Sequence, residues 1–380
     1  MQPFNVSHLL PPHPNLKLCV TIPARNEEVY IFQALKALSE QMGVDNSEYE
    51  VIVLINHSSD NTLRICRDFV KSNPNFKLHI LVTYSTAITN VGAARKMLMD
   101  IASERLTNDA HIIAMTDADS RVGKYWVKSM LGYTSHDIDL ICGALEVNED
   151  FPSVVSRELY IAKQRYLYLR SRLESVFLPD CYDPWPRHAF SCGPNMGIKK
   201  SAYRTIGGMP ALEFLEDAAL YNRVVKNGLK IKHCLHMEVE TSARSNAKVA
   251  RGFGDELSYW TKQGNTFVYK VEGLDKLICR LKAFSMISDA YTKKENRDFS
   301  EAAKDLQLPV SVLKRLETVN RNPRAMHAML VRILENHSLW QKNHPNSCVF
   351  KALNELENYF DENNSENQLA FSHKTSSYPV

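Results

Sequence analysis

Short apolar runs alternate with helical stripes through the first third of this sequence. Each of the first three runs precedes a segment whose apolar residues recur at helical spacing, and a fourth run follows the third such segment. The four runs that we predict to be buried strands are residues 18–22, 49–55, 78–82 and 111–114. Connections long enough to hold a helix join parallel strands and place helices on both faces of the sheet. The sequence therefore predicts an α/β fold with a mostly parallel sheet flanked by helices.

Polar segments follow the predicted strands at residues 23–28, 56–62 and 116–121. Because the carboxyl ends of parallel strands meet at one edge of a sheet, we expect these segments to gather there, where open α/β sheets bind ligands. Asn26 can also cap a helix that follows the first strand. The segments contain neither the Gly-X-Gly-X-X-Gly pattern of dinucleotide-binding proteins nor the glycine-rich loop and lysine of a P-loop. The layout indicates a nucleotide site of another type.

The third polar segment carries two aspartates, Asp117 and Asp119. Alternate residues of an extended chain share a face, so we expect both carboxylates to point the same way. Convergent carboxylates repel one another unless a cation or a proton lies between them. Oxygen ligands without a nearby Cys/His cluster suit Mg²⁺ or Mn²⁺, ions that also hold substrate phosphates. A solvated turn after a strand is the alternative interpretation of this Asp-X-Asp.

The second half of the sequence is less regular. Its expected elements are a strand at 138–147, a long helix with an apolar seam at 154–176, a helix from about 215 to 226 and a strand at 231–241. The helix near 215 begins with Glu216 and Asp217. From residue 274 onward the pattern is helical and charged, and residues 361–380 are polar enough to be disordered.

Composition restricts the classes of function. A net charge of +3 over 380 residues gives no reason to expect nucleic-acid binding, which needs a concentrated basic face. No apolar stretch approaches the length of a membrane-spanning helix, and residues 1–16 lack the basic and apolar regions of a signal peptide. The eight cysteines form no Cys-X-X-Cys pair, so we expect reduced core residues and no zinc site or disulfide framework. A soluble, cytoplasmic protein is the expectation.

Six short motifs, taken together, resemble the family-2 glycosyltransferases, which have the Rossmann-like GT-A fold. In chain order they are Pro23-Ala24-Arg25-Asn26-Glu27-Glu28, residues 56–62, residues 90–95, residues 116–120, residues 193–196 with Gly207-Gly208, and Glu216-Asp217. The resemblance implies a nucleotide-diphosphate sugar as donor, such as a UDP- or GDP-sugar. It also implies Mn²⁺ or Mg²⁺ at the Asp-X-Asp and transfer of a sugar to an acceptor hydroxyl that the sequence does not identify.

The resemblance assigns the donor side residue by residue. Glu27 would accept hydrogen bonds from the ribose, and Asn56 stands where the family usually has an aspartate that reads the base edge, which leaves the base open. A cation in the first helical turn is electrostatically unfavourable, so Arg95 implies a contact to a phosphate or the base. Asp117 is assigned to the ribose and the metal, and Asp119 to the metal that bridges the diphosphate. The implied nucleotide-sugar-binding residues are Pro23, Ala24, Arg25, Glu27, Asn56, Ser58, Arg95, Asp117, Ala118 and Asp119.

The resemblance also assigns an acceptor side. Asp217 matches the position of the general base in an inverting enzyme, and Glu216 would orient that base or contact the acceptor. Gly193 and Asn195 match the acceptor-binding loop. These four residues complete the implied catalytic and acceptor-binding set.

One motif of the processive members, Gln-X-X-Arg-Trp, is absent from the corresponding region. Its absence implies a non-processive enzyme that adds one sugar. Arg244 and Arg251 follow in the same region and are candidates for binding the leaving diphosphate, with a basic surface loop as the alternative.

The resemblance divides the chain into a tail (1–16), a GT-A catalytic domain (17–272), a helical C-terminal extension (273–360) and a second tail (361–380). Within the catalytic domain, residues 17–125 form the nucleotide-sugar-binding half and residues 126–272 the acceptor half. We expect the apolar seam of the long helix to pack on the acceptor half, with a homodimer as the alternative.

Three other functions are alternatives to an inverting transferase. A retaining GT-A enzyme would act on a small phosphorylated or carboxylated acceptor. A non-catalytic nucleotide-sugar-binding protein should have lost Asp117, Asp119 or Asp217, and all three are present. A sugar nucleotidyltransferase should open with a glycine-rich loop that carries Arg and Lys, which residues 23–28 are not.

Overall fold

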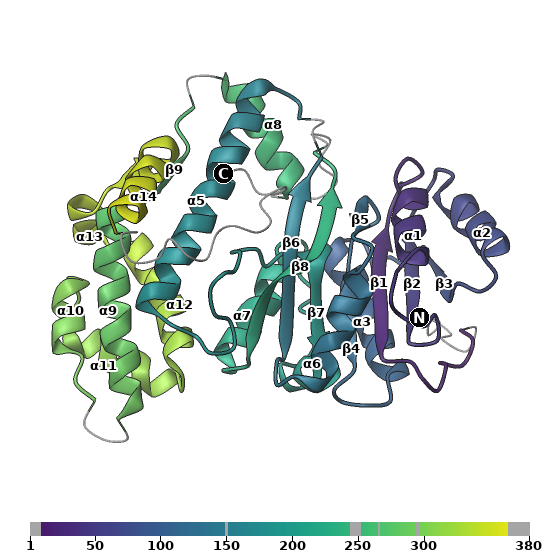
Figure 1. The fold of residues 1–380 in the computed structure, drawn as a ribbon, viewed down its shortest axis with the longest axis horizontal. Helices are drawn as coiled ribbons and strands as arrows, with labels where there is room; N and C mark the ends of the chain where they lie inside the picture. The colour runs from purple at the N-terminus through teal and green to yellow at the C-terminus, as the bar shows by residue number, and fades with distance from the viewer. Residues whose placement is uncertain (1–8, 149–150, 244–251, 265–266, 294–296, 364–380) are drawn as a thin grey trace. The chain divides into compact units, whose positions relative to one another are not determined.

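The computed structural model describes residues 9–148, 151–243, 252–264, 267–293 and 297–363. The chain divides into two compact units (Figure 1). One comprises Met1–Phe151 with Phe190–Ser258, and the other comprises Pro152–Ala189 with Tyr259–Val380. This division groups residues 152–189 with the C-terminal helices, whereas the domain boundary expected from the sequence lay at residue 272.

The first unit is built on an eight-stranded sheet with the order β3-β2-β1-β4-β7-β6-β8-β5. The first four strands of the chain are parallel neighbours, and a helix lies in each connection between them (Figure 1). These elements are β1 (Leu18–Ala24), α1 (Ile31–Ser39), β2 (Tyr49–Asn56), α2 (Thr62–Ser72), β3 (Leu78–Thr83), α3 (Val91–Arg105) and β4 (Ile112–Met115). The predicted alternation and the α/β class of the fold are confirmed.

The other half of the sheet reverses direction at β7. This strand is antiparallel to β4 on one side and to β6 on the other, β8 is parallel to β6, and β5 pairs antiparallel with β8 at the edge. The elements are β5 (Ser120–Val122), α4 (Trp126–Leu131), β6 (Leu140–Val147), β7 (Met196–Lys199), α6 (Lys200–Thr205), α7 (Glu216–Lys226) and β8 (Ile231–Thr241). The helix α8 (Phe253–Gln263) begins in this unit, and its residues from Tyr259 onward belong to the second unit. Two 3₁₀ turns, Gly132–Ser135 and Gly193–Asn195, complete this half.

The core of the first unit explains why its strands are visible in the sequence. Val20 and Ile22 of β1 lie in one buried cluster with Ile31 and Leu35 of α1 and Phe69 of α2. The helix α3 also packs on β1 and β2, and every residue of β2 is buried. A strand buried on both faces requires a near-continuous apolar run. Glu50, the charged exception within β2, is buried and paired with Arg105.

The loop after β1 differs from the prediction that Asn26 caps a helix. The helix α1 begins at Ile31, and Asn26 adopts a left-handed backbone conformation with φ of 54°. Its backbone N–H donates to the Ser58 hydroxyl, and its side-chain oxygen accepts from the Ser59 N–H. Asparagine tolerates this conformation because its short polar side chain bonds locally. The residue thereby ties the loop after β1 to the loop after β2 at one edge of the sheet.

The second unit is mainly helical. Its elements are α5 (Val154–Phe177), β9 (Lys270–Glu272), α9 (Leu274–Thr292), α10 (Ser300–Asp305), α11 (Val310–Val319), α12 (Pro323–Glu335), α13 (Ser338–Asn343), β10 (Asn346–Cys348) and α14 (Val349–Asn363). Ser153 and Ser156 form a capping box at the start of α5. None of the helices in the described ranges has both the length and the apolar character that a bilayer-spanning segment requires.

The partner of the long helix differs from the one expected. The helix α5 packs on α14 and α9, both in the predicted C-terminal extension, and we had expected its seam to pack on the acceptor half. Helical spacing of apolar residues identifies a buried face without identifying what covers it. The partner depends on tertiary structure, which the spacing does not encode.

Candidate active site

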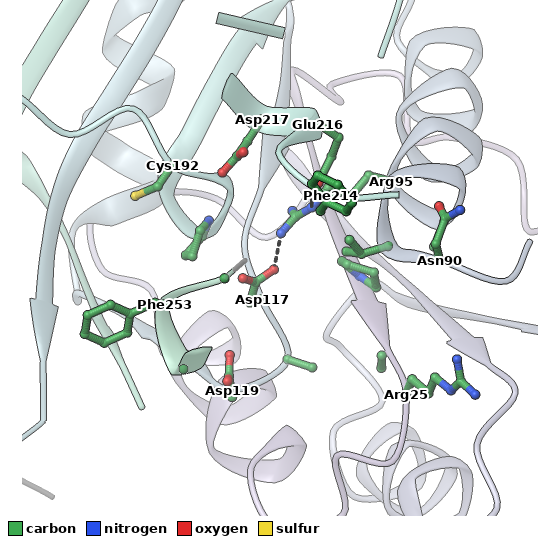
Figure 2. A pocket seen from close by; sticks show the side chains of 18 of the residues that line it. Arg25, Asn90, Arg95, Asp117, Asp119, Cys192, Phe214, Glu216, Asp217 and Phe253 are labelled. Atoms are coloured by element: carbon green, nitrogen blue, oxygen red, sulfur yellow. Dashed lines mark hydrogen bonds and ion pairs between the residues drawn. The ribbon is translucent and has the colours of Figure 1, made fainter. Parts of the chain in front are cut away.

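A cavity of about 610 Å³ lies in the first unit at the carboxyl ends of β1, β2 and β4 (Figure 2). Its N-terminal wall consists of Pro23, Ala24, Arg25, Glu27, Asn56, Thr89, Asn90, Val91, Ala94, Arg95, Asp117, Ala118 and Asp119. Its C-terminal wall consists of Leu145, Cys192, Pro194, Glu213, Phe214, Leu215, Glu216, Asp217, Thr241, Ser242, Gly252, Phe253 and Gly254. Segments far apart in the sequence thus meet at one site.

Asn56 places a buried amide in the N-terminal wall. It is 4% exposed, and its Oδ1 has no hydrogen-bond partner among the described residues. Glu27 beside it is also buried, and its backbone N–H donates to the Thr62 hydroxyl. A buried oxygen without a partner is unfavourable in a folded protein unless a ligand or water supplies a donor. This wall is therefore suited to a ligand with a polar N–H or O–H edge.

Asp117 and Asp119 reach the cavity from the loop between β4 and β5 (Figure 2). The strand alternation that we expected to align them is absent, because β4 ends at Met115. No three His, Cys, Asp or Glu side chains of the described ranges are grouped so that they could hold a metal ion. Two carboxylates fit Mg²⁺ or Mn²⁺ when substrate phosphates and water complete the coordination, which is the usual arrangement for Mg²⁺.

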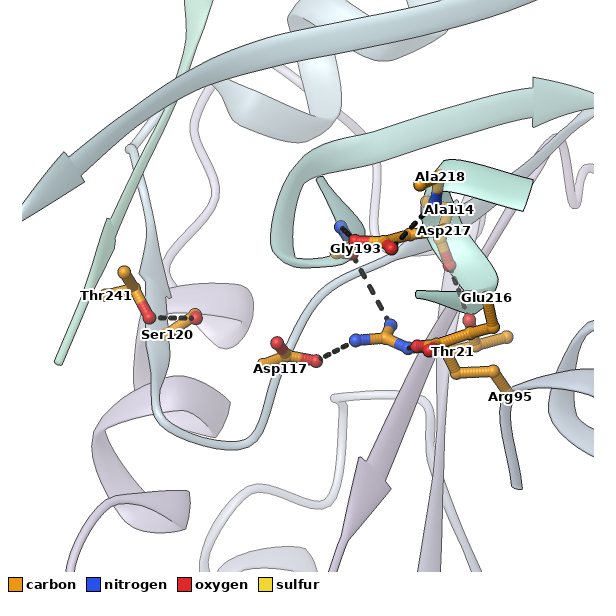
Figure 3. Close-up of polar contacts among 10 residues, drawn as sticks. All are labelled: Thr21, Arg95, Ala114, Asp117, Ser120, Gly193, Glu216, Asp217, Ala218 and Thr241. Atoms are coloured by element: carbon orange, nitrogen blue, oxygen red, sulfur yellow. Dashed lines mark hydrogen bonds and ion pairs between the residues drawn. The ribbon is translucent and has the colours of Figure 1, made fainter. Parts of the chain in front are cut away.

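Arg95 joins the two walls through three hydrogen bonds (Figure 3). Its side chain is 5% exposed, and its Nη2 donates to Asp117 Oδ1 at 2.5 Å. Its Nε donates to Glu216 Oε1 at 2.8 Å, and its Nη1 donates to the Gly193 carbonyl at 3.4 Å. A Cβ on residue 193 would lie 2.6 Å from Nη2, so a side chain at this position would have to displace the Arg95 guanidinium. The guanidinium that we expected to face a phosphate or the base is bound here to protein carboxylates.

The charged side chains around Arg95 shift one another's pKa values. Burial raises the pKa of Glu216, and the negative charges of Asp217 and Asp117 raise it further, while Arg95 opposes both effects. Burial alone would lower the pKa of Arg95, but Asp117, Glu216 and Asp217 raise it above its usual value. Arg95 therefore remains protonated and compensates the carboxylates that surround it.

Asp217 lies in the first turn of α7, directly beside this network (Figure 3). Its Oδ2 accepts from the Gly193 N–H at 2.7 Å, and its Oδ1 accepts from the Ala218 N–H at 2.7 Å. A carboxylate oxygen has two acceptor sites, so both oxygens can still accept a hydrogen bond from a ligand. The two backbone bonds fix the orientation of the carboxylate at the cavity.

The structure brings most of the proposed site residues to the cavity, and three of the described ones do not line it. Pro23, Ala24, Arg25, Glu27, Asn56, Arg95, Asp117, Ala118, Asp119, Glu216 and Asp217 line it. Ser58, Gly193 and Asn195 do not. Ser58 holds Asn26, and Gly193 holds Asp217 and Arg95. Arg244 and Arg251, the candidates for binding the diphosphate, lie outside the described residues.

Asn195 requires a correction, because we expected it to bind the acceptor. It is 0% exposed, and its Oδ1 accepts from Trp126 Nε1. Its Nδ2 donates to the carbonyls of Ala144 and Met237, so it joins β6 to β8 beside the register shift at Gly143. All of its hydrogen bonds go to the protein interior, which makes it a structural residue of the sheet.

We expect Asn195→Ala to destabilise the fold without changing the chemistry of the cavity. The substitution leaves one buried donor and two buried carbonyls without their partner, and each such group costs about 1–3 kcal/mol. Urea unfolding measures the loss of stability, and nucleotide affinity at low temperature serves as the control. An unchanged unfolding midpoint would contradict the structural role.

The residues that sequence reasoning missed are mainly apolar or lie late in the chain. Leu145, Phe214, Leu215 and Phe253 line the C-terminal wall together with Thr241, whose hydroxyl is 3.1 Å from that of Ser120. A search for charged and metal-binding patterns does not detect apolar side chains. Phe214 and Leu215 directly precede Glu216 in the sequence, and their position next to this motif is the feature from which they could have been predicted.

Fold and site together define a class of protein, α/β domains that bind ligands in a cleft at the carboxyl ends of the strands. Residues 19–207 match the family model described as glycosyl transferase family 2. The chain belongs to this family, as the six motifs predicted.

The proteins that are similar to this chain share a low sequence identity with it. A protein of Bacillus subtilis (strain 168) named "Probable glycosyltransferase YdaM" is 27% identical over 225 residues, which is 57% of this chain and 48% of that protein. The chain thus spans about half the length of this relative. Among solved structures, residues 1–349 of S. aureus TarS with UDP-GlcNAc align at 17% identity and a TM-score of 0.44, covering 80% of this chain and 74% of that one. The Pyrobaculum calidifontis mannosyltransferase PcManGT with GDP-Man and Mn²⁺ aligns at 13% sequence identity and a TM-score of 0.44. This alignment covers 95% of this chain and 91% of the PcManGT chain.

Proposed function

We propose that this chain transfers one sugar from a nucleotide-diphosphate sugar to an acceptor hydroxyl, with inversion at the anomeric carbon. The observation that carries the proposal is that Asp117 and Asp119 on one wall and Asp217 on the other share a single cavity. A transferase must hold its donor beside the group that activates the acceptor, and a common cavity permits this. Membership of glycosyl transferase family 2 supports the class of reaction.

Asp217 acts as the general base in this proposal. It takes the proton of the acceptor hydroxyl while that oxygen forms its bond to the anomeric carbon. The bond between the anomeric carbon and the donor phosphate breaks at the same time, and the nucleoside diphosphate leaves with the electron pair. The N–H of Gly193 keeps the carboxylate oriented, and Arg95 holds Glu216, the neighbouring residue at the start of α7.

Asp119 and Asp117 are the residues that would hold Mn²⁺ or Mg²⁺. Such an ion supplies positive charge to the departing diphosphate when it is bound. The donor set consists of two carboxylates, and no third His, Cys, Asp or Glu of the described residues is grouped with them, so substrate phosphates and water would complete the coordination, as these ions prefer.

Thermal denaturation with UDP-sugars and GDP-sugars, each with and without Mn²⁺, tests the donor part of the proposal. A ligand at one hundred times its Kd stabilises the folded state by about 2.7 kcal/mol, so a cognate donor gives a clear shift in Tm. Free sugars and Mn²⁺ alone are the controls. If no nucleotide-sugar raises the Tm or is hydrolysed in the presence of Mn²⁺, the proposal fails.

We expect Asp119→Asn to leave the protein folded and to remove the Mn²⁺ dependence of nucleotide-sugar binding. The amide keeps the size of the side chain but lacks the charge that a divalent cation needs. Calorimetric titration of the variant with and without Mn²⁺ measures the effect. Asp68→Asn on the exposed surface of α2 is the matched control. Binding with the metal dependence of the unmodified protein would show that Asp119 is not a ligand.

A further inference from the structure

We propose that the acceptor is an uncharged sugar or glycoside that packs an apolar face against the C-terminal wall. This inference rests on the transferase function proposed above and specifies its second substrate. The observations that support it are the charges and the apolar side chains of that wall.

The charge of the C-terminal wall disfavours an anionic acceptor. It contains three acidic side chains, Glu213, Glu216 and Asp217, and none of the described residues that form it is a lysine, arginine or histidine. Arg95, which approaches from the other wall, is already bound to Asp117 and Glu216. Among the described residues of this wall, a phosphate or carboxylate placed beside Asp217 would meet like charges, which opposes binding. An uncharged acceptor avoids this repulsion.

The apolar side chains of the same wall supply the attractive part of the argument. They are Leu145, Cys192, Pro194, Phe214, Leu215 and Phe253. Figure 2 shows the side chains of Phe214 and Phe253 at the cavity, with Asp117 between them in this view. Sugars carry apolar C–H faces as well as hydroxyls, and aromatic and aliphatic side chains bury such faces favourably. The wall therefore combines apolar side chains with three acidic ones, of which Asp217 is the one that receives the acceptor hydroxyl in our proposal.

Leu215 is the most specific element of this surface. It directly precedes α7, is 49% exposed and has a left-handed backbone conformation with φ of 57°. A leucine in this conformation is strained, and such strain concentrates at binding and active sites. Leu212, three residues earlier, is 45% exposed but does not line the cavity. The pair allows two similar leucines to be compared, one inside the proposed acceptor surface and one outside it.

A series of acceptors that differ in charge tests the inference. The full chain, with Mn²⁺ and the nucleotide-sugar that stabilises it, is assayed with p-nitrophenyl glucoside, glucose, glucose 6-phosphate and glucuronate, and with the matching galactose and mannose series. Products are detected by mass spectrometry. We expect the aryl glycoside to be the best acceptor and the charged sugars to have kcat/KM values lower by about ten-fold or more, because juxtaposed like charges oppose binding.

Two outcomes overturn the inference. One is transfer to a phosphorylated or carboxylated sugar as efficient as transfer to its neutral counterpart. The other is an enzyme that hydrolyses its donor but transfers to none of the neutral acceptors. A protein that neither binds nor hydrolyses any donor would instead contradict the proposed function, so the two failures are distinguishable.

The variant Leu215→Asn tests the position of the surface. Asparagine tolerates the left-handed conformation, so the fold is preserved. We expect the KM for the aryl glycoside to rise about ten-fold, the usual effect of losing an apolar pocket contact, with the KM for the donor unchanged. Leu212→Asn is the matched control and should leave both constants unchanged. Equal effects of the two substitutions, or no effect of Leu215→Asn, would place the acceptor elsewhere.

Discussion

Replacing Asp217 with asparagine should lower kcat by roughly 10²–10⁴-fold, the usual loss when a positioned general base is removed. The amide oxygen can still accept the N–H bond from Gly193, and the bond from the Ala218 N–H is lost, so we expect the fold to persist with a local change at the start of α7. The amide cannot take a proton from the acceptor hydroxyl. Donor and metal binding belong to the N-terminal wall in our proposal, so the KM for the donor should change little. The loss therefore falls on kcat, because proton removal develops only toward the transition state.

Steady-state kinetics of Asp217→Asn measure the loss of kcat. NMR of the product determines whether the anomeric configuration is inverted or retained. Titration with the donor and Mn²⁺ confirms that the variant still binds. In a retaining enzyme the departing phosphate could itself accept the proton, so the same substitution would have a small effect. Retention of configuration together with a nearly unaffected kcat would show that Asp217 is not the base.

The sequence predicted the parts of the fold and site that depend on local pattern. The strands β1 and β2 are buried on both faces, so their apolar runs were unmistakable, and polar motifs such as Asn56 and Asp117 could be placed at their ends. Parallel pairing then implied that these motifs would meet. The cavity contains both residues, which is the part of the site that pattern and topology determine.

Long-range pairing of side chains was not predictable in the same way. Arg95 and Glu216 are 121 positions apart, and their ion pair depends on how α3 and α7 approach one another in the folded chain. Asn195 was assigned to the acceptor because it lies in a matching motif, whereas its burial follows from the packing of β6, β7 and β8. The sequence supplies the residue type in each case, and tertiary structure decides whether that residue faces a ligand or the protein.

Removing the positive charge of Arg95 should have the largest effect on stability. Arg95→Met retains much of the apolar volume but leaves Asp117 and the buried Glu216 without their partner. Breaking a buried ion pair on one side costs about 3–5 kcal/mol near neutral pH. Lys96→Met, on the next residue of α3, is the matched control, because Lys96 pairs with Asp100 at the exposed surface. Exposed pairs of this kind contribute about 0.3–0.5 kcal/mol, so the control should scarcely change the stability.

The effect of Arg95→Met should depend on pH in a defined direction. Burial raises the pKa of Glu216 in the folded protein, so the folded state holds this proton at a pH where the unfolded chain has released it. Stability therefore falls as the pH rises through the interval between the two pKa values. Arg95 opposes the rise in the pKa of Glu216, so the loss of Arg95 should widen this interval and make the variant least stable at neutral and higher pH.

Urea unfolding at pH 5 and pH 8 measures this effect. The loss of stability in Arg95→Met should be smaller at pH 5, and the double variant Arg95→Met/Glu216→Gln should regain part of the stability at pH 8. A deficit that is equal at both pH values and is not relieved in the double variant would mean that the charge of Glu216 is not what Arg95 stabilises.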